Sequence, residues 1–300
     1  MTKLREIMKK ERYPVMRVAV LSDIHSNHLA LEACLRYIEK QGIKKLILLG
    51  DYVSDCPNPQ ITLKLLREIR ATYEVWCIRG NREEYFIKHD EGYPDGWVYE
   101  ANTGNLLYTY DNLTSEDIRW FESLSNTGIV EIEGTEPIIL AHGSLKNSRE
   151  LLYEHDDNTK AVLESITYKY MLCGHTHRQF SYEYKGKVIM NPGSVGVPIG
   201  CKKSAHMAIM EWTNHKWNFE FQTIPYDYQQ LVNEFEESEM KDKAYLWLRC
   251  ILRSIEDGVN YAPTCVKKAY DIAAKEMKEV DWNHIPPRYW NEAAKEMGII

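Results

Sequence analysis

The sequence lacks a hydrophobic run long enough to cross a membrane, and it has no excess of positive charge. Its most apolar stretches, such as Leu46-Ile47-Leu48-Leu49, have the length of a buried strand, whereas a membrane-spanning helix needs about 20 apolar residues. The 300 residues carry 37 basic and 44 acidic side chains, for a net charge of −7. This charge disfavours a protein that coats nucleic acid or an anionic membrane surface.

Paired cysteines and targeting signals are also missing. The seven cysteines are scattered and form no Cys-x-x-Cys pair, which disfavours a zinc–thiolate site or a disulfide framework. The first ten residues mix acidic and basic side chains without an apolar core, so we predict no secretory signal. Together these features favour a cytoplasmic protein. No Gly-x-Ser-x-Gly or P-loop sequence indicates a protein nucleophile or a nucleotide-binding loop.

What is present up to about residue 225 is an alternation of short apolar runs and helical patterns. This alternation is typical of βαβ units and an α/β fold. We expect early helices near residues 29–38 and 63–69, and a long surface loop at 91–112. Expected strands lie at 17–22, 45–49, 73–78, 129–132, 137–140, 168–172, 181–184, 187–190, 205–212 and 216–222. The later strands favour antiparallel pairing, including a hairpin at Lys185-Gly186, so the sequence predicts two stacked sheets.

Beyond Pro225 the strand patterns stop and helical spacing takes over. Apolar residues recur at i, i+3 and i+4 in three segments, and Pro286-Pro287 is suited to open a short last helix. We therefore predict two units, residues 1–225 and a helical C-terminal appendage of residues 226–300.

Five of the predicted strands end beside a turn residue and an Asp, Asn or His side chain. These side chains are Asp23, His25, Asp51, Asn81, His142, His175 and His177. Residues i and i+2 of an extended segment point the same way, so Asp23 with His25, and His175 with His177, can each address one point. Carboxylate, amide and imidazole groups converging at one sheet edge indicate a site for divalent transition metals.

The motifs Asp-x-His, Gly-Asp, Gly-Asn, His-Gly and Gly-His-Thr-His, in this order, resemble those of the calcineurin-like metallophosphoesterases. Residues 50–59 and 191–196 are similar to the small bacterial and archaeal phosphodiesterase branch of that family. The Ser/Thr protein phosphatase branch is less similar, because its Gly-Asp precedes Asp-Arg-Gly, where this chain has Ser54-Asp55-Cys56. The resemblance covers roughly residues 16–224.

The resemblance implies a four-layer αββα sandwich of two mixed β-sheets with two metal ions at the sheet edge. It also implies the ligands: Asp23, His25 and His177 for one ion, Asn81, His142 and His175 for the other, and Asp51 as the bridge. Such a ligand set favours Mn²⁺, Fe, Zn²⁺, Ni²⁺ or Co²⁺ over Ca²⁺. Among these, manganese is the ion with which we would test activity.

One residue departs from the family pattern. Most members read Gly-Asn-His at the third motif, and that histidine is taken to protonate the leaving group, but this chain has Arg82. A guanidinium cannot act as a general acid near neutral pH, although its paired N–H groups can hold a phosphoryl oxygen. The alternative is a solvated turn arginine. A substrate with a good leaving group, or another acid such as His28, would compensate for the missing histidine.

We therefore predict a metal-dependent hydrolase that cleaves a phosphodiester or a small phosphorylated metabolite, with catalytic roles for Asn81, Arg82 and His142. One alternative is a scaffold module of the same fold, like the retromer subunit, but such proteins lose ligands that are all present here. A second is a nuclease of the same superfamily, which the net charge disfavours. No membrane partner is expected, and a homo-oligomer is compatible with the sequence.

Two further segments have two interpretations each. The turn Asn191-Pro192-Gly193-Ser194 either offers backbone N–H groups to an anion beside the metals or is a plain loop between strands. The aromatic residues of the central loop either stack on a nucleobase or pack within the protein, and packing is the default. They are Tyr93, Trp97, Tyr99, Tyr108 and Tyr110.

Overall fold

The computed structural model describes residues 16–99, 102–282 and 285–300. The N-terminal ten residues, for which the sequence predicts no secretory signal, lie outside these ranges. Within them, every helix is too short or too polar to cross a membrane.

The first sheet has five strands in the order β10-β9-β1-β2-β3. Its parallel core consists of β1 (Met16–Leu21), β2 (Lys45–Leu48) and β3 (Glu74–Cys77), while β9 (Ser204–Thr213) and β10 (Lys216–Pro225) add antiparallel strands. The register pairs Leu21 with Leu48 and Leu48 with Cys77, so the parallel strands end side by side. Residues that follow these strands therefore emerge at one edge.

The second sheet has the order β4-β5-β6-β8-β7. Strands β5 (Ile138–Ala141), β6 (Tyr170–Leu172) and β8 (Lys187–Pro192) are parallel, and β4 (Thr127–Val130) and β7 (Gln179–Tyr184) flank them in antiparallel pairing. The predicted hairpin between β7 and β8 is confirmed. Its turn residues Lys185 and Gly186 both have positive φ, as a tight two-residue hairpin turn requires.

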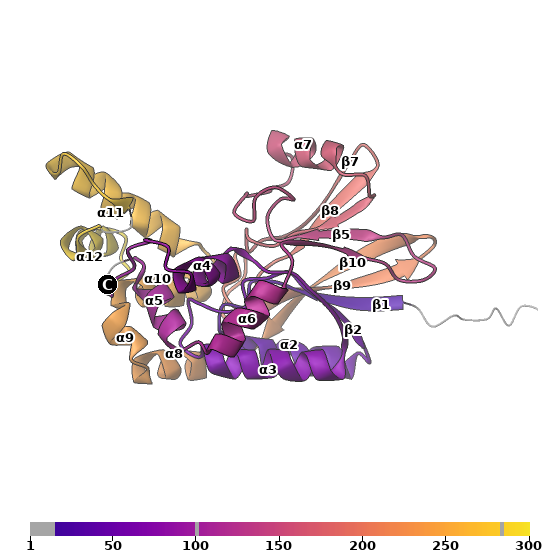
Figure 1. The fold of residues 1–300 in the computed structure, drawn as a ribbon, viewed down its shortest axis with the longest axis horizontal. Helices are drawn as coiled ribbons and strands as arrows, with labels where there is room; N and C mark the ends of the chain where they lie inside the picture. Colours follow the sequence, from indigo (N-terminus) through magenta and orange to yellow (C-terminus); the bar gives the residue numbers. More distant parts are fainter. Residues whose placement is uncertain (1–15, 100–101, 283–284) are drawn as a thin grey trace, which may run out of the picture.

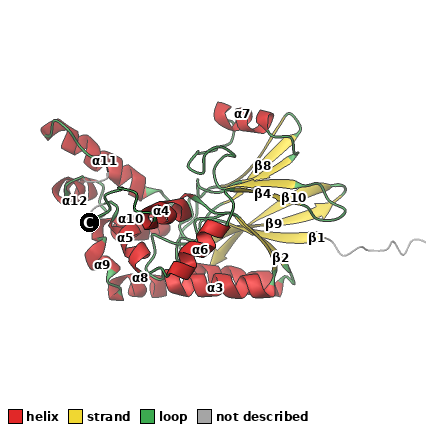
Figure 2. Cartoon of the chain, in the orientation of Figure 1, coloured by secondary structure: helices red, strands yellow, loops and turns green. Residues whose placement is uncertain are grey.

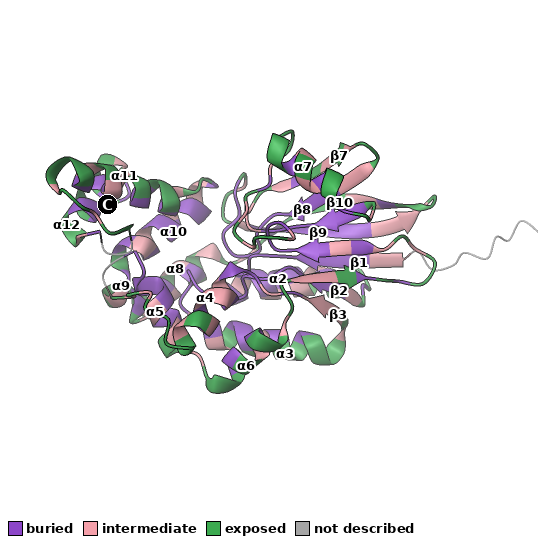
Figure 3. Ribbon diagram, turned by 45° about the horizontal axis from the view of Figure 1, so that its top comes forward, coloured by how far each residue is buried: buried purple, intermediate pink, exposed green. Residues whose placement is uncertain are grey.

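The sheets and helices form four layers (Figures 1 and 2). Helices α2 (His28–Lys40) and α3 (Pro59–Thr72) cover the outer face of the first sheet, and α7 (Asp157–Ser165) covers the second. Alternate residues of β1 face opposite ways, so Ala19 and Leu21 pack in the core under the helices whereas Val18 and Val20 pack between the sheets. Figure 3 shows β1 and β9 buried along most of their length, whereas the edge strands β3 and β10 are largely intermediate or exposed. The predicted αββα sandwich is confirmed.

The prediction of a loop over residues 91–112 is wrong in its second half. Helix α5 (Gly104–Asp111) begins there, between α4 (Asn81–Asp90) and α6 (Ser115–Ser123), which the sequence did not indicate either. Helix α5 is short, and such helices depend on tertiary packing. It packs against α9 (Met240–Lys243), and a Cβ added at Gly104 would lie 2.5 Å from the Lys243 carbonyl oxygen. This support comes from distant sequence.

The segment after β10 is helical, as predicted. It contains α8 (Tyr228–Glu237), α9, α10 (Tyr245–Asp257), α11 (Tyr261–Glu276) and α12 (Pro287–Glu296), which lie beyond the carboxyl ends of the strands of the first sheet (Figure 1). Pro287 occupies the first turn of α12. These helices share an apolar core with Cys56, Tyr108 and Val197, so they pack directly on the loops beyond the strands. A domain boundary at residue 225 stays a prediction.

Candidate metal centre

Six of the seven expected ligands converge at the carboxyl ends of strands from both sheets. They form two groups of three, and within each group the ligand atoms lie within 4.8 Å of one another: Asp23, His25 and His177, and Asp51, His142 and His175. Strands β1 and β2 deliver the carboxylates and His25, while β5 and β6 deliver the other histidines. The candidate ligands thus come from the edges of both sheets, and no single segment of the chain supplies a whole group.

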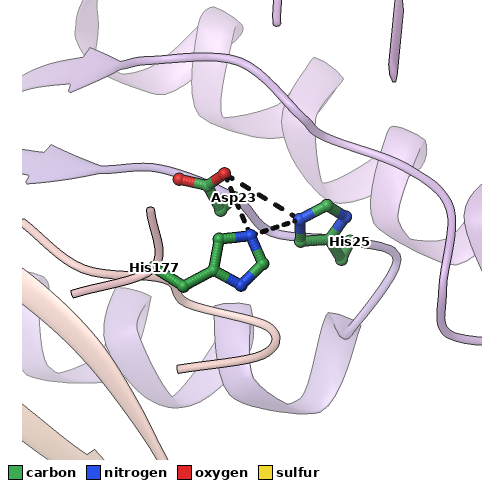
Figure 4. A group of neighbouring side chains, drawn as sticks. All are labelled: Asp23, His25 and His177. Atoms are coloured by element: carbon green, nitrogen blue, oxygen red, sulfur yellow. Dashed lines mark hydrogen bonds and ion pairs between the residues drawn. The ribbon is translucent and has the colours of Figure 1, made fainter. Parts of the chain in front are cut away.

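The first group joins one carboxylate to two imidazoles (Figure 4). His177 Nε2 lies 3.3 Å from Asp23 Oδ1 and 3.0 Å from His25 Nε2. His25 Nε2 lies 3.9 Å from the same Asp23 oxygen. Three donor atoms that converge in this way are suited to one divalent transition metal.

The second group adjoins the first. His142 Nε2 lies 3.4 Å from Asp51 Oδ2 and 3.8 Å from Asp23 Oδ1. Asp51 Oδ2 in turn lies 3.9 Å from His25 Nε2, so each carboxylate reaches a histidine of the other group. This arrangement is compatible with two neighbouring cations and with Asp51 between them.

Each of the four histidines has one ring nitrogen held by an oxygen of the protein. Nδ1 of His142 lies 2.7 Å from the Leu49 carbonyl, and Nδ1 of His177 lies 2.7 Å from the Val197 carbonyl. His175 Nε2 lies 3.1 Å from the Arg149 carbonyl, and His25 Nδ1 lies 3.1 Å from Asp55 Oδ2. An N–H donated to such an acceptor leaves the other ring nitrogen with a free lone pair, as in metal-bound histidines. His142 Nε2 indeed has no hydrogen-bond partner within the described ranges.

The backbone of the site occupies an unusual region. Asp23, His25, Asp51, His175 and His177 all have φ between +50° and +66°. Non-glycine residues adopt this region at an energetic cost and mostly where surrounding structure enforces it. Here Asp23 N donates to the Gly50 carbonyl and His25 N to the Asp51 carbonyl, both at 3.0 Å. These bonds tie the first two motif loops together.

The buried charged groups of the site shift one another's pKa values. Burial would raise the pKa values of the Asp23 and Asp51 carboxyls, but neighbouring histidines hold both below their usual range. Burial would lower the pKa of His142, but Asp51 and Asp23 raise it to about 10. Burial lowers the pKa values of His25 and His175 to about 4. The ionised carboxylates and the neutral His25 and His175 are in the state that binds metal. His142, and His177 whose pKa Asp23 also raises, must each release a proton before binding it.

Asn81, the seventh expected ligand, opens α4 at the end of β3. Its side chain is buried, and its Oδ1 has no hydrogen-bond partner among the residues that the structure covers. A buried amide oxygen without a partner costs free energy unless another group satisfies it. A cation would do so, which fits the expected role.

Arg82 lies in the first turn of α4 rather than in a loose turn, and its charge faces the site. Its guanidinium lies 4.0 Å from Asp51 Oδ2 and 3.4 Å from Asp55 Oδ2. Burial would lower the pKa of this group, but the Asp55 and Asp51 carboxylates raise it above its usual value. Arg82 is therefore a fixed cation beside the candidate metal ligands, not a solvated turn residue.

We expect Arg82→Ala to lower kcat/KM for a phosphate ester on the order of 10²-fold, because a charge-assisted donor to the phosphoryl group is lost. Metal content should stay that of the wild type, since Arg82 is not a ligand. Steady-state kinetics and metal analysis of the purified variant test this, with Arg119→Ala on exposed α6 as the control. Unchanged kinetics would reject the phosphate-holding role.

Asp55 is a site residue that sequence reasoning passed over. It is buried, and its carboxylate contacts His25, Arg82, Asn105 and Trp247 at distances from 2.7 to 3.4 Å. A carboxylate on Nδ1 of a metal-binding histidine orients the ring and raises its basicity. The feature of the sequence that could have indicated Asp55 is its position four residues after Asp51.

Asp55→Asn should weaken metal binding at the first group by roughly 10- to 100-fold, the usual effect of losing such an outer carboxylate. Asparagine keeps the side-chain shape, so the fold should persist. Titration of metal-free protein with Mn²⁺ measures the change, and affinity equal to that of the wild type would show that Asp55 does not orient His25.

Glu83 was missed as well. Its carboxylate accepts hydrogen bonds from the backbone N–H groups of Gly80, Asp51 and Tyr52, each at 2.8 Å. It thereby fixes the Asp51 loop against the start of α4. Burial and the nearby Asp51 charge raise the pKa of Glu83 to about 7. The feature of the sequence that could have indicated Glu83 is its position three residues after Gly80, which is the N3 position of a helix.

His28, suggested as the replacement acid, contacts two carboxylates: its Nε2 lies 2.9 Å from Glu234 of α8 and its Nδ1 lies 3.6 Å from Glu32. Its role as an acid stays a prediction. The Asn191–Ser194 turn is not an open anion cradle. The backbone N–H groups of Gly193 and Val195 already donate to Asn191 Oδ1 and to the Ser22 carbonyl. The Asn191 and Ser194 side chains donate to the carbonyls of Gly174 and Asp23, so the turn supports the loops that carry the candidate ligands.

The comparisons with known proteins agree with this geometry. The calcineurin-like phosphoesterase superfamily domain matches residues 16–215. An uncharacterized protein of Methanocaldococcus jannaschii is 28% identical over 246 residues, 77% of this chain and 95% of that one. A phosphodiesterase of the same organism is 20% identical over 178 residues, 59% of this chain and 83% of that one.

Among solved structures, a metallophosphoesterase from Sphaerobacter thermophilus superimposes with a TM-score of 0.62 at 22% identity, covering 82% of this chain and all of that one. At this level of identity the likeness concerns the fold.

Proposed function

This chain belongs to the calcineurin-like phosphoesterase superfamily, and on that premise we propose that it hydrolyses a phosphodiester or a small phosphorylated metabolite with two divalent cations. The observation that carries the proposal is the pair of adjoining carboxylate–imidazole groups, in which all four histidines have one ring nitrogen anchored on the protein.

The donor set fits the cations. Asp23, His25 and His177 would hold one ion, Asn81, His142 and His175 the other, and Asp51 would lie between them. Bound there, divalent cations would polarise phosphoryl oxygens and lower the pKa of a water molecule. Oxygen and imidazole donors in this mixture suit Mn²⁺, Fe²⁺, Co²⁺, Ni²⁺ or Zn²⁺.

The residues of the chain would position the ester. Arg82 presents N–H donors beside Asp51, where they can hold a phosphoryl oxygen and offset its charge. Since Arg82, which cannot donate a proton near neutral pH, stands at the position of the family's leaving-group histidine, we expect esters with acidic leaving groups to be cleaved fastest.

The test is reconstitution of activity. Protein stripped with a chelator should be inactive toward bis(p-nitrophenyl) phosphate and p-nitrophenyl phosphate, and Mn²⁺ should restore hydrolysis. The ratio of the two rates would assign the preference for diester or monoester. Hydrolysis that is absent with each of the five candidate metals would reject the proposed function.

A further inference from the structure

A cavity of about 550 Å³ lies between the candidate metal centre and the C-terminal helices. It is lined by α4, by the segment between α4 and α5, and by α5, α10 and α11. Its volume is in the range of small-molecule sites. Helices α10 and α11, which lie outside the αββα sandwich, therefore form part of the wall of this cavity beside the proposed site of hydrolysis.

One end of the cavity adjoins the candidate metal ligands. Arg82 lines it while its guanidinium lies 4.0 Å from Asp51 Oδ2. Arg149 also lines it, and the carbonyl oxygen of Arg149 is 3.1 Å from His175 Nε2. A phosphate held at the metal centre would therefore have its organic substituent within reach of this cavity.

The rest of the lining is rich in aromatic side chains. Tyr93 and Trp97 come from the central segment, Trp247 from α10, and Trp282 from the segment before α12. Tyr93 and Trp282 are 63% and 48% exposed. Large aromatic surfaces left open to solvent around a cavity indicate a ligand with a flat apolar face. Of the five aromatic residues singled out in the sequence, Tyr93 and Trp97 line the cavity, whereas Tyr99, Tyr108 and Tyr110 do not appear in its lining.

Three of these rings contact a partner within the protein. Trp97 stacks on His89 with a centroid distance of 4.3 Å and an interplanar angle of 5°. The Trp247 indole N–H donates to Asp55 Oδ1 at 2.9 Å, and Trp282 packs on Tyr270 at 5.2 Å. Fixed rings lose little conformational entropy when a planar group stacks on them.

The charge of the lining favours an anion. Lys88 and Arg149 line the cavity as cations, and Arg82 adds a third that also contacts Asp51 and Asp55. Asp95, the acidic residue of the lining, pairs with His89 at 2.9 Å. Asn105 adds a buried amide whose Oδ1 has no hydrogen-bond partner in the described part of the chain. An N–H group of a heteroaromatic ring would satisfy that oxygen. Phosphate, ring and ring N–H together describe a nucleotide.

We propose that this cavity binds the nucleobase of a nucleotide substrate, so that the C-terminal helices determine substrate choice. The inference rests on the proposed function, since the phosphate of the same molecule would lie at the metal centre. Base stacking on fixed aromatic rings, with cations at the phosphate end, is the recognition that sequence-tolerant nucleotide sites use.

The kinetic test compares two esters that differ only in the base: adenosine 5′-(p-nitrophenyl phosphate) and ribose 5-(p-nitrophenyl phosphate). The Mn²⁺-loaded wild type should prefer the adenosine ester in kcat/KM on the order of 10-fold or more. Trp97→Ala and, separately, Trp282→Ala should reduce this preference several-fold. Trp76→Ala, on edge strand β3 away from the cavity lining, should keep the wild-type ratio.

A binding measurement separates the two proposals. Metal-free protein should show tryptophan fluorescence quenching by adenosine 5′-monophosphate and none by ribose 5-phosphate, and Trp97→Ala should weaken the binding. Hydrolysis of both esters with equal kcat/KM would overturn the base-binding site and leave the phosphoesterase standing. Quenching by adenosine 5′-monophosphate alone, with no hydrolysis of either ester under any of the five candidate metals, would support the base-binding site and reject the phosphoesterase. Equal responses to the two phosphates would overturn the base-binding site.

Discussion

Asp51→Asn is expected to lower kcat/KM for a phosphate ester on the order of 10³-fold or more, with the metal content falling from two ions toward one. The buried carboxylate lies 3.4 Å from His142 Nε2 and 3.9 Å from His25 Nε2, so it can reach both groups, and we propose it as the bridge between the two ions. Asparagine replaces one of its two oxygens with an N–H₂ group that cannot ligate a cation. Neither proposed ion would then keep its full set of donors.

The shape of the site should survive this change, because asparagine matches aspartate in size. Asp51 is held mainly through its backbone N–H, which donates to Glu83, while its Oδ1 accepts from the Arg82 backbone N–H. Circular dichroism should thus match the wild type, and Asp157→Asn, on an aspartate whose side chain is 98% exposed on α7, provides the control. A variant that keeps two ions and full activity would contradict the bridging role.

Gly50→Ala should reduce the free energy of unfolding by roughly 3 kcal/mol or more, because the new side chain has no room. Gly50 has φ of +92°, and an added Cβ would lie 2.2 Å from the Gly80 backbone nitrogen and 2.7 Å from the Arg79 carbonyl carbon. The Gly-Asp and Gly-Asn loops are therefore in direct backbone contact. Pushing them apart would also displace Asp51 and Asn81.

Gly200 offers a matched control for this prediction. Its φ is +95°, nearly that of Gly50, but nothing lies within 4 Å of a Cβ added there. Gly200→Ala should therefore cost only the conformational penalty of about 1–2 kcal/mol. Urea denaturation of metal-free protein gives both values, and equal losses would show that crowding at Gly50 has no role.

The strands, and the six candidate ligands that the structure brings together, could be predicted because their signals are local. Buried parallel strands are short apolar runs, and polar residues that follow them must emerge at the sheet edge. The αββα layers and the pairing of ligands into two groups came from the likeness of the motifs to a known family. Local patterning alone does not say which strand ends face each other.

The rest depended on contacts between distant parts of the chain. Helix α5 is stabilised by packing against α9, more than 120 residues later, which no local pattern reports. The role of Asp55 arises because the loop after β2 turns its carboxylate toward His25, Arg82 and Trp247 at once. For the same reason, no local pattern indicates the aromatic cavity, which α10 and α11 form together with the central segment.

The measurement that tests the central claim most directly is anomalous diffraction from crystals grown with Mn²⁺. The account predicts two peaks side by side, one contacted by Asp23, His25 and His177 and the other by Asn81, His142 and His175, with Asp51 touching both. Crystals that contain Mn²⁺ in the medium but show no peak between these side chains would contradict it.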